Sequence, residues 1–331
     1  MSVISSDVFQ LGVVKLTGGP PPVIPATPIF TLARLSGESI NFQPTTSISP
    51  ELDASGQVRD SILTGARSTG SVELPLSRHP YFDDALAAVL RSAWGTGTKG
   101  DGSGPPPVTS AVAADELIVG NTLSLYCVEK RFANPAGGFI YHRFNDSAVA
   151  SMSLSISPGK EIGVSVAYSG GTMDPVESMI AGATYPDPGT RPLFTAPEVS
   201  EVTIAGVTNA LCFSDLGMEF NSNVRGIECI GTLGFKEQVL GRFEATIRGS
   251  AYFASNDLLD YLINQAVFPV TLTLEDPTAN KYTFFYPRCR MTAGGANAGG
   301  TNQDVVSSIA MQALYDPAYL YTVKVTRVRV A

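Results

Sequence analysis

The side chains that most often perform acid–base catalysis are scarce in this sequence. Its 331 residues contain two histidines, His79 and His142. Histidine is the commonest general acid or base, but neither residue lies near a nucleophile motif, and no GxSxG, HExxH or DxDxDG pattern occurs. His79 precedes Pro80 at the start of an expected helix, and His142 lies in an expected hairpin. We interpret both as structural residues.

Adjacent carboxylates at Asp83 and Asp84 could suggest a general acid and base acting together. Neighbouring residues on a helix point in different directions, however, so these two groups would not easily share a substrate. Acidic side chains in a first helical turn stabilise the helix through its dipole. We therefore interpret the pair as a feature of the helix start.

Two glycine-rich stretches raise the question of phosphate binding. Residues 95–100 (GTGTKG) lack the Gly-Lys-Ser/Thr end of a P-loop. Residues 294–300 (GGANAGG) lead into an expected strand, without the helix N-terminus that would hold an anion. We interpret both as loops that become ordered on assembly. The sequence therefore predicts no catalytic residue, no cofactor and no enzyme activity.

The four cysteines show no metal-ligand spacing. None belongs to a CxxC pair and none has a histidine nearby, and each lies in or beside an apolar run. We expect buried free thiols and no metal site. The residues are Cys127, Cys212, Cys229 and Cys289.

The charge of the chain argues against a protein that grips nucleic acid. The formal net charge is −8, whereas proteins that neutralise phosphates are basic. Charged residues make up only 16% of the chain, below the roughly 25% of an average soluble domain, which suggests that partners cover much of the surface. No run of 18 apolar residues and no signal-like N-terminus occurs, so we expect no membrane contact and synthesis in a cytoplasm.

The remaining pattern is mainly that of strands. Residues 71–76 alternate with period two, and residues 82–93 carry apolar side chains at helical spacing between Pro80 and Gly95. A long strand from 237 to 250 and a short helix from 256 to 266 follow later in the same order. We expect an N-terminal arm (1–28), a first β domain (29–170), a linker (171–197) and a second β domain (198–331).

The order of these elements suggests an internal duplication. At an offset of 171, Gly70 falls on Gly241 and Tyr81-Phe82 falls on Tyr252-Phe253, while Glu73 falls on Glu244. The strand alternation stays in phase between these points, so the same face would be buried in both copies. We predict a mainly β chain in which a β-sandwich or barrel flanked by a short helix is present twice.

An ordered series of segments resembles phage tail tube proteins. The series covers about residues 35–325, and none of its motifs is diagnostic alone. Its members are the stretches at 50–62 and 69–72, CVEKRF at 127–132, YHRF at 141–144, VASMSLSI at 149–156 followed by Pro158-Gly159, YTFFYPRC at 282–289, and VVS to ALYD at 305–316.

The resemblance implies a structural virion protein whose subunits form closed rings that stack into a tail tube. Sheets of neighbouring subunits would join into an inner barrel, and rings of this family usually hold six tube domains. With two such domains in one chain, we favour a trimeric ring with pseudo-sixfold symmetry, and a hexamer is the alternative. The implied partners are the chain itself and the tape measure, tail terminator and distal tail proteins. DNA would be met only in passage.

Two sets of residues are candidates for this role. Glu73 and Glu244 are candidate lumen residues, because an acidic channel repels DNA, although the same face could instead meet a neighbouring subunit. The candidate inter-ring loops contain Pro20, Pro21, Pro22, Ser49, Glu51, Asp53, Gly294, Asn297 and Gly300.

One alternative is a carbohydrate- or receptor-binding β-sandwich of a tail tip or cell surface. Such a module usually displays aromatic side chains on loops. Trp94 is the only tryptophan, and it lies at the end of the first expected helix, where core packing is expected. The size of the chain favours a non-contractile tail.

Overall fold

The structure is a computed structural model that describes most of the chain. The described residues are 9–18, 21–51, 55, 57–135, 137–176, 178–205, 207, 211–253, 255–298, 300–301 and 303–330. The fold is mainly β with two short α-helices in this described part, as predicted. The helices are α1 (Pro80–Val89) and α2 (Asp257–Ile263), with a short 3-10 helix at Ala196–Glu198.

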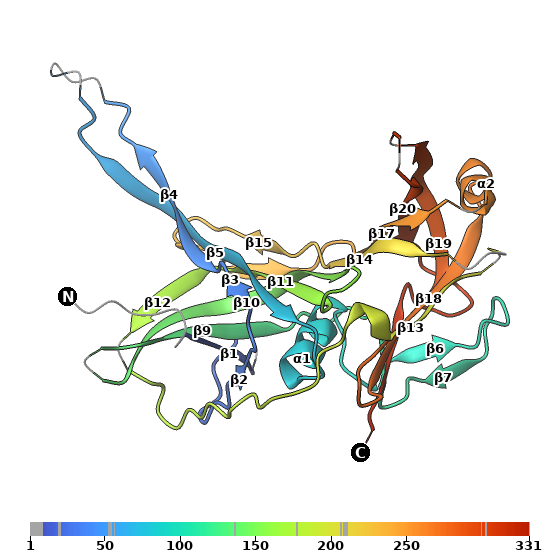
Figure 1. Ribbon diagram of the computed structural model, residues 1–331. Helices are drawn as coiled ribbons and strands as arrows, with labels where there is room; N and C mark the ends of the chain where they lie inside the picture. Colours follow the sequence, from blue (N-terminus) through green and yellow to red (C-terminus); the bar gives the residue numbers. More distant parts are fainter. Residues whose placement is uncertain are drawn as a thin grey trace.

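Along the chain the strands divide between a first half and a second half, which the colours of Figure 1 follow from blue to red. Those of the first half are β1 (Gln10–Lys15), β2 (Thr31–Leu32), β3 (Gly37–Glu38), β4 (Asn41–Ile48), β5 (Ser61–Pro75), β6 (Thr98–Gly100), β7 (Thr109–Ala111), β8 (Glu116–Ile118), β9 (Leu125–Ala133), β10 (Phe139–Ile156), β11 (Gly163–Gly170) and β12 (Thr172–Val176). Those of the second half are β13 (Val199–Ile204), β14 (Phe213–Asn221), β15 (Arg225–Ile227), β16 (Glu237–Val239), β17 (Glu244–Tyr252), β18 (Val267–Glu275), β19 (Lys281–Ala298), β20 (Val305–Ala313) and β21 (Lys324–Val328).

Helix α1 begins where the sequence predicts. Pro80 occupies the first turn, where its missing N–H costs nothing, and His79 is the N-cap. The Nδ1 atom of His79 accepts a hydrogen bond from the backbone N–H of Tyr81 at 3.2 Å. Phe82, Leu86 and Val89 are fully buried, so this helix packs its apolar side into the core.

The two halves repeat one strand-pairing scheme. In the first half the strands pair in the order β1, β9, β10, β11, β5, β4, and in the second in the order β13, β18, β19, β20, β17, β14. The long strands β10 and β19 each carry a bulge at the same place, after Val149 and after Met291. The predicted duplication is therefore present in the fold.

The offset of the repeat differs from the predicted one. The first residues of α1 and α2, Pro80 and Asp257, give an offset of 177. The predicted offset of 171 is wrong, because Tyr81 lies in α1 whereas Tyr252 ends β17. An even shift of six leaves the period-two alternation in phase, so the strand pattern alone could not distinguish the two offsets. Glu73 and Glu244 are consequently not equivalent positions.

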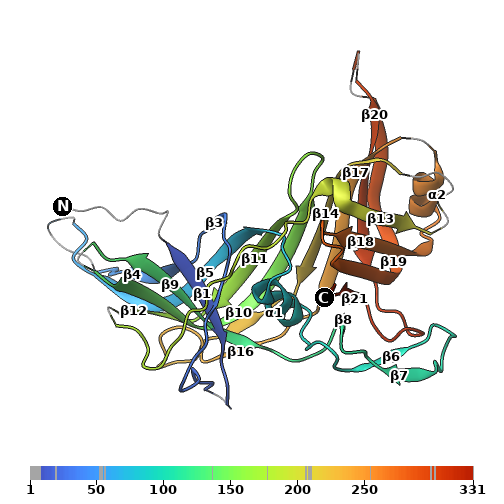
Figure 2. The ribbon, with the colours of Figure 1, turned by 60° about the horizontal axis from the view of Figure 1, so that its bottom comes forward.

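Strand β14 joins the halves into one sheet. It pairs with β10 through six residue pairs and with β17 on its other side. A continuous antiparallel sheet of eight strands results, in the order β4, β5, β11, β10, β14, β17, β20, β19 (Figures 1 and 2). The pairings within the described ranges form an open, branched series, so the barrel form of the prediction is not found in the single chain.

The halves also share one hydrophobic core. A single cluster of buried residues includes Val72 and Phe82 of the first half and Phe284 and Met311 of the second. Strand β8 of the first half pairs with β21 of the second. The predicted boundaries at 28, 170 and 197 stay predictions, but the halves do not fold around separate cores.

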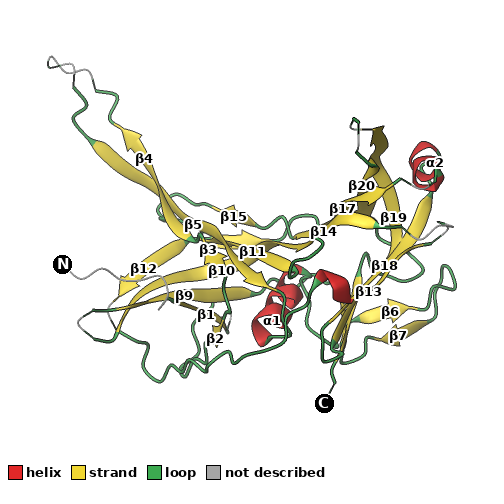
Figure 3. Ribbon diagram, in the orientation of Figure 1, coloured by secondary structure: helices red, strands yellow, loops and turns green. Residues whose placement is uncertain are grey.

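Several expected loops contain strands. Residues 10–15 of the expected arm form β1, which is largely buried and pairs with β9. Residues 172–176 of the expected linker form β12, which pairs with β10. The candidate inter-ring residues Ser49 and Glu51 follow β4 at the end of a long β4–β5 hairpin, which projects from the body of the molecule (Figure 3).

Candidate assembly surfaces

One face of the eight-stranded sheet is solvent-exposed and built from small polar residues. Cross-strand pairing sets Glu73 beside Ser165, Ser165 beside Ser153, and Ser153 beside Glu219. Glu219 in turn lies beside Thr246 of β17. The alternate residues of these strands, such as Val72, Leu154 and Met218, point into the core. This serine-rich face runs across both halves without interruption.

Both candidate lumen residues lie on this serine-rich face. Glu73 is exposed on β5, and Glu244 is half-buried on β17. Strands β11, β10 and β14 separate them, a distance of roughly 19 Å at the usual strand spacing. The structure thus places the pair on one surface, although not in equivalent positions of the repeat.

The serine-rich face carries charges of both signs. Glu73, Asp215 and Glu219 are exposed acids of this face, and Arg67 of β5 and Arg248 of β17 are exposed cations. Arg242 forms a salt bridge with Glu244, and its hydrogen bond lowers the pKa of that carboxyl group. Among the described ion pairs none involves Glu73. Glu73, Asp215 and Glu219 are therefore exposed acids of this face without a described ion-pair partner. Asp215 and Glu219 alternate with apolar residues in 213–221, and this pattern in the sequence could have identified them.

The projecting β4–β5 hairpin exposes apolar side chains. Ile48, Val58 and Ile62 are 59%, 67% and 57% exposed. Ser49 and Glu51, two of the candidate inter-ring residues, lie at the end of this hairpin, and Asp53 lies outside the described residues. Apolar clusters left open on a folded chain commonly mark contact surfaces.

The other candidate inter-ring residues divide into two groups. Pro21 is exposed and Pro22 half-buried in the connection between β1 and β2, and Pro20 lies outside the described residues. Gly294 and Asn297 lie within strand β19, which continues to Ala298, so the start of the loop predicted at 294 is wrong. Asn297 pairs through its backbone with Val306, and its side chain lies outside the description. Gly300 lies in the exposed turn that follows.

The two helices differ in how much of their surface is covered. Seven of the ten residues of α1 are buried, whereas Leu258 is the buried residue of α2. Leu259 and Ile263 of α2 are 41% and 68% exposed. Helix α2 therefore presents an apolar side that no part of the described chain covers.

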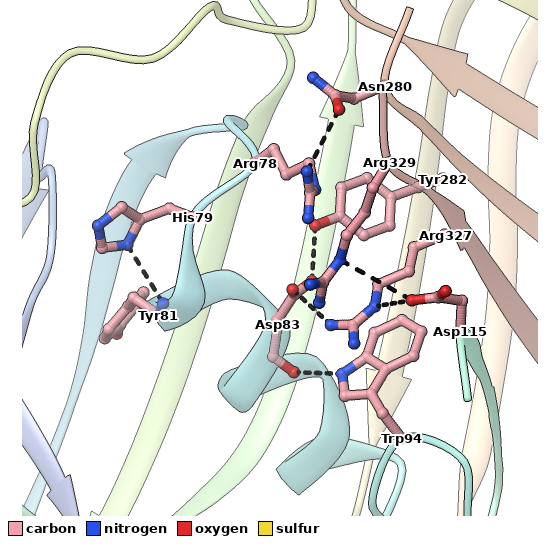
Figure 4. Close-up of polar contacts among 10 residues, drawn as sticks. All are labelled: Arg78, His79, Tyr81, Asp83, Trp94, Asp115, Asn280, Tyr282, Arg327 and Arg329. Atoms are coloured by element: carbon pink, nitrogen blue, oxygen red, sulfur yellow. Dashed lines mark hydrogen bonds and ion pairs between the residues drawn. The ribbon is translucent and has the colours of Figure 1, made fainter. Parts of the chain in front are cut away.

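Helix α1 is covered by the second half through a buried polar cluster (Figure 4). The Oδ1 atom of Asp83 accepts a hydrogen bond from the Tyr282 hydroxyl group at 2.6 Å, and its Oδ2 atom lies 2.6 Å from Nη1 of Arg327. Arg327 also contacts Asp115 at 3.0 Å and lies 4.1 Å from the centre of the Trp94 ring. Asp83 thus ties the halves together in addition to its place in the first helical turn.

The described residues contain no candidate metal centre. No group of three His, Cys, Asp or Glu side chains is close enough to hold a metal ion in that part of the chain. Burial raises the pKa of the Cys127 and Cys289 thiols to about 12 in both cases. Cys212 is exposed and Cys229 half-buried, so the predicted burial is wrong for these two free thiols.

Two further observations concern the membrane and Trp94. Across the described ranges, neither helix has the length and apolar character needed to span a bilayer.

Trp94 donates a hydrogen bond from Nε1 to the backbone oxygen of Asp83 at 3.1 Å. With Arg327 over its ring, this tryptophan is part of the contact between the halves, as its expected packing role implies.

Comparison with known proteins agrees with the architecture. No curated protein sequence matches the chain. The family model described as phage tail tube protein matches residues 9–313, which include strands β1 to β20 and both helices. A β-rich fold with an extended sheet, projecting hairpins and uncovered apolar surface suits a subunit that is completed by its neighbours. The chain belongs to the phage tail tube protein family and is a structural component of the bacteriophage virion.

Proposed function

We propose that three copies of this chain close into a ring and that the rings stack into the tube through which DNA is ejected. The observation that carries the proposal is the repeated pairing scheme, because it puts two tube-type units in one chain. Closed rings remove the exposed sheet edges that otherwise invite uncontrolled pairing. Six units per ring then need three chains, with pseudo-sixfold symmetry.

The width of the sheet favours three chains over six. Each chain supplies eight adjacent strands. At about 4.8 Å between strands, three chains give a barrel roughly 37 Å wide before strand tilt is counted, and six chains give about twice that. The smaller barrel fits closely around one DNA duplex, with its serine-rich face toward the lumen.

The ring symmetry is the direct test. Purified tubes imaged by electron microscopy should show three chains of 34.9 kDa per ring. Mass measurement of isolated rings should give the same number. Six chains per ring would overturn the trimer, and monomers that bind glycans would support the receptor-binding alternative in place of the tube.

The proposed environment follows from this role. Stacking would use the β4–β5 hairpin and the connection that contains Pro21 and Pro22. The ends and interior of the tube would contact tail terminator, distal tail and tape measure proteins, and synthesis would take place in the host cytoplasm. The protein would act without catalysis or a cofactor, and it would meet DNA only in passage.

A further inference from the structure

The sheet continues from the first half to the second at a junction of known register. Strands β10 and β14 pair from Ser151 opposite Asn221 to Ile156 opposite Leu216. Ser153 and Glu219, in the middle of this junction, lie side by side on the serine-rich face. A backbone hydrogen bond from Ser222 to the Ala150 oxygen extends the contact by one step.

The internal repeat identifies the counterparts of both strands. Strands β10 and β19 have the same length and begin at Phe139 and Lys281, so 293–298 correspond to 151–156. Glu219 lies opposite Thr246. At the offset of 177, Thr69 is the counterpart of Thr246, and Thr69 lies opposite Asn41. Asn41 is therefore the counterpart of Glu219. Residues 38–43 therefore correspond to 216–221, with Ile40 at the core position of Met218 and Phe42 at that of Phe220.

These counterparts are strand edges that the single chain leaves open. In the described pairings, residues 293–298 bond to β20 on one side only, and the β3–β4 edge bonds to β5 only. Residues 293–298 (AGGANA) and 39–43 (SINFQ) contain no charged residue, and Glu38 at the end of the β3–β4 edge forms an ion pair with Lys130. Charged side chains are one way in which natural proteins protect open sheet edges, so edges without them are suited to pairing with another strand.

The two helices give a second, independent indication. Helix α1 is covered by β19 and β21 of the following half, through Tyr282 and Arg327. Helix α2 has no following half, and its Leu259 and Ile263 side chains are exposed. The same rotation and translation that relate the first half to the second half, applied once more, would place the first half of a second copy over α2.

We propose that the junction between successive chains repeats the junction inside the chain. Strand β19 of one copy pairs antiparallel with the β3–β4 edge of a second copy, with Gly294 opposite Phe42 and Gly295 opposite Asn41. Pro44 is the counterpart of Ser222, whose backbone N–H donates a hydrogen bond inside the chain. Because proline has no N–H, the pairing between chains ends at Gln43. This proposal rests on the ring assembly proposed above, and it identifies the two strand edges that would close the ring.

Disulfide trapping tests the register in the assembled protein. The variant carries Asn41→Cys and Gly295→Cys in a background of Cys212→Ser and Cys229→Ser. A Cβ at Gly295 meets no atom within 4 Å, so the substitution fits. Opposed residues of an antiparallel pair have Cα atoms about 4.5–5.5 Å apart, within the range of about 4.4–6.8 Å that a disulfide spans. Oxidised tubes should give covalent multimers of up to three chains on a non-reducing gel, and more than half of the chains should be linked.

The chain offers matched controls. Ser153→Cys with Glu219→Cys places the same pair inside one chain, and it should form an intramolecular disulfide with or without assembly. Gln43→Cys with Ala293→Cys is a second in-register pair, which keeps the test valid if the first variant fails to fold. Gln43→Cys with Gly295→Cys is shifted by two residues and should not cross-link.

The outcomes separate this proposal from the proposed function. Rings in the electron microscope with linked in-register pairs support both. Rings in which the shifted pair links, or in which neither in-register pair links, overturn the register and leave the ring intact. Absence of rings from the unmodified protein overturns the ring assembly and the register together.

Discussion

At the scale of single residues, the polar side chains near α1 are structural, but their partners could not be predicted. The sequence places Asp83 in a first helical turn and His79 at the helix start, and both expectations hold. Tyr282 and Arg327, which bind Asp83, lie 199 and 244 residues away in the sequence. No local pattern links groups so far apart, so the buried cluster emerges only from the tertiary structure.

His79 should make the stability of the chain depend on pH. Burial and the positive charges of Arg191 and Arg34 lower its pKa from 6.5 to about 4. Between these two pKa values His79 is protonated in the unfolded chain and neutral in the folded chain. The free energy of unfolding therefore falls as the pH drops from 6.5 to 4, and this contribution stays constant at lower pH. His79→Asn keeps an N-cap acceptor without a titrating group.

Urea unfolding of the unassembled chain at pH 7 and pH 4 measures this effect. The free energy of unfolding of the unsubstituted protein should fall by about 2 kcal/mol more than that of His79→Asn. An equal fall in both proteins would show that His79 titrates normally in the folded state.

At the scale of elements, strands and helices with clear periodicity could be predicted, and their exact extents could not. Residues 71–76 and the first helix are found near the expected places. The strand expected from 237 to 250 is divided, because Gly241 bonds to the Asn223 oxygen at 3.0 Å instead of a neighbouring strand. Strand β1 was missed because Gly- and Pro-rich residues follow it closely.

The β4–β5 hairpin carries the prediction that belongs to this scale. Changing Ile48, Val58 and Ile62 together to Ser should leave rings intact and shorten the tubes, because each apolar side chain loses about 1.5–3 kcal/mol of burial between rings. Tube length in electron micrographs measures the effect. Thr46→Ser on the same hairpin is the matched control, and tubes of normal length from the triple variant would exclude the hairpin from stacking.

At the scale of the whole molecule, the duplication could be predicted but its register could not. Glu73 and Glu244 seemed equivalent at an offset of 171, whereas the counterpart of Glu73 is Ser250. The two acids nevertheless share one face, because the continuous sheet carries both. Glu73 and Glu244 therefore share an environment because they lie on the same face of the sheet, and not because they are equivalent positions of the internal repeat.

The charge of this face should affect DNA transport. Glu73→Lys with Glu244→Lys turns two repelling groups per chain into attracting ones, so DNA ejection should slow severalfold at low salt and less at high salt. Ejection followed by dye fluorescence measures the rate. Asp101→Lys with Asp187→Lys, outside the eight strands, gives the same net charge. Equal rates in both variants would remove the serine-rich face from the lumen.

The double pairing of β14 also changes the mass action of assembly. Inside each chain one sheet junction is complete as soon as folding ends, because covalent linkage makes that contact intramolecular. The proposed ring would bring together three free chains, where a ring of unduplicated subunits would bring together six, and every chain that joins a ring loses translational and rotational entropy. The concentration of the proposed rings would then rise with the third power of the chain concentration rather than the sixth. Such rings would form at lower subunit concentrations, even though the open edge is made of small residues such as Gly294 and Gly295.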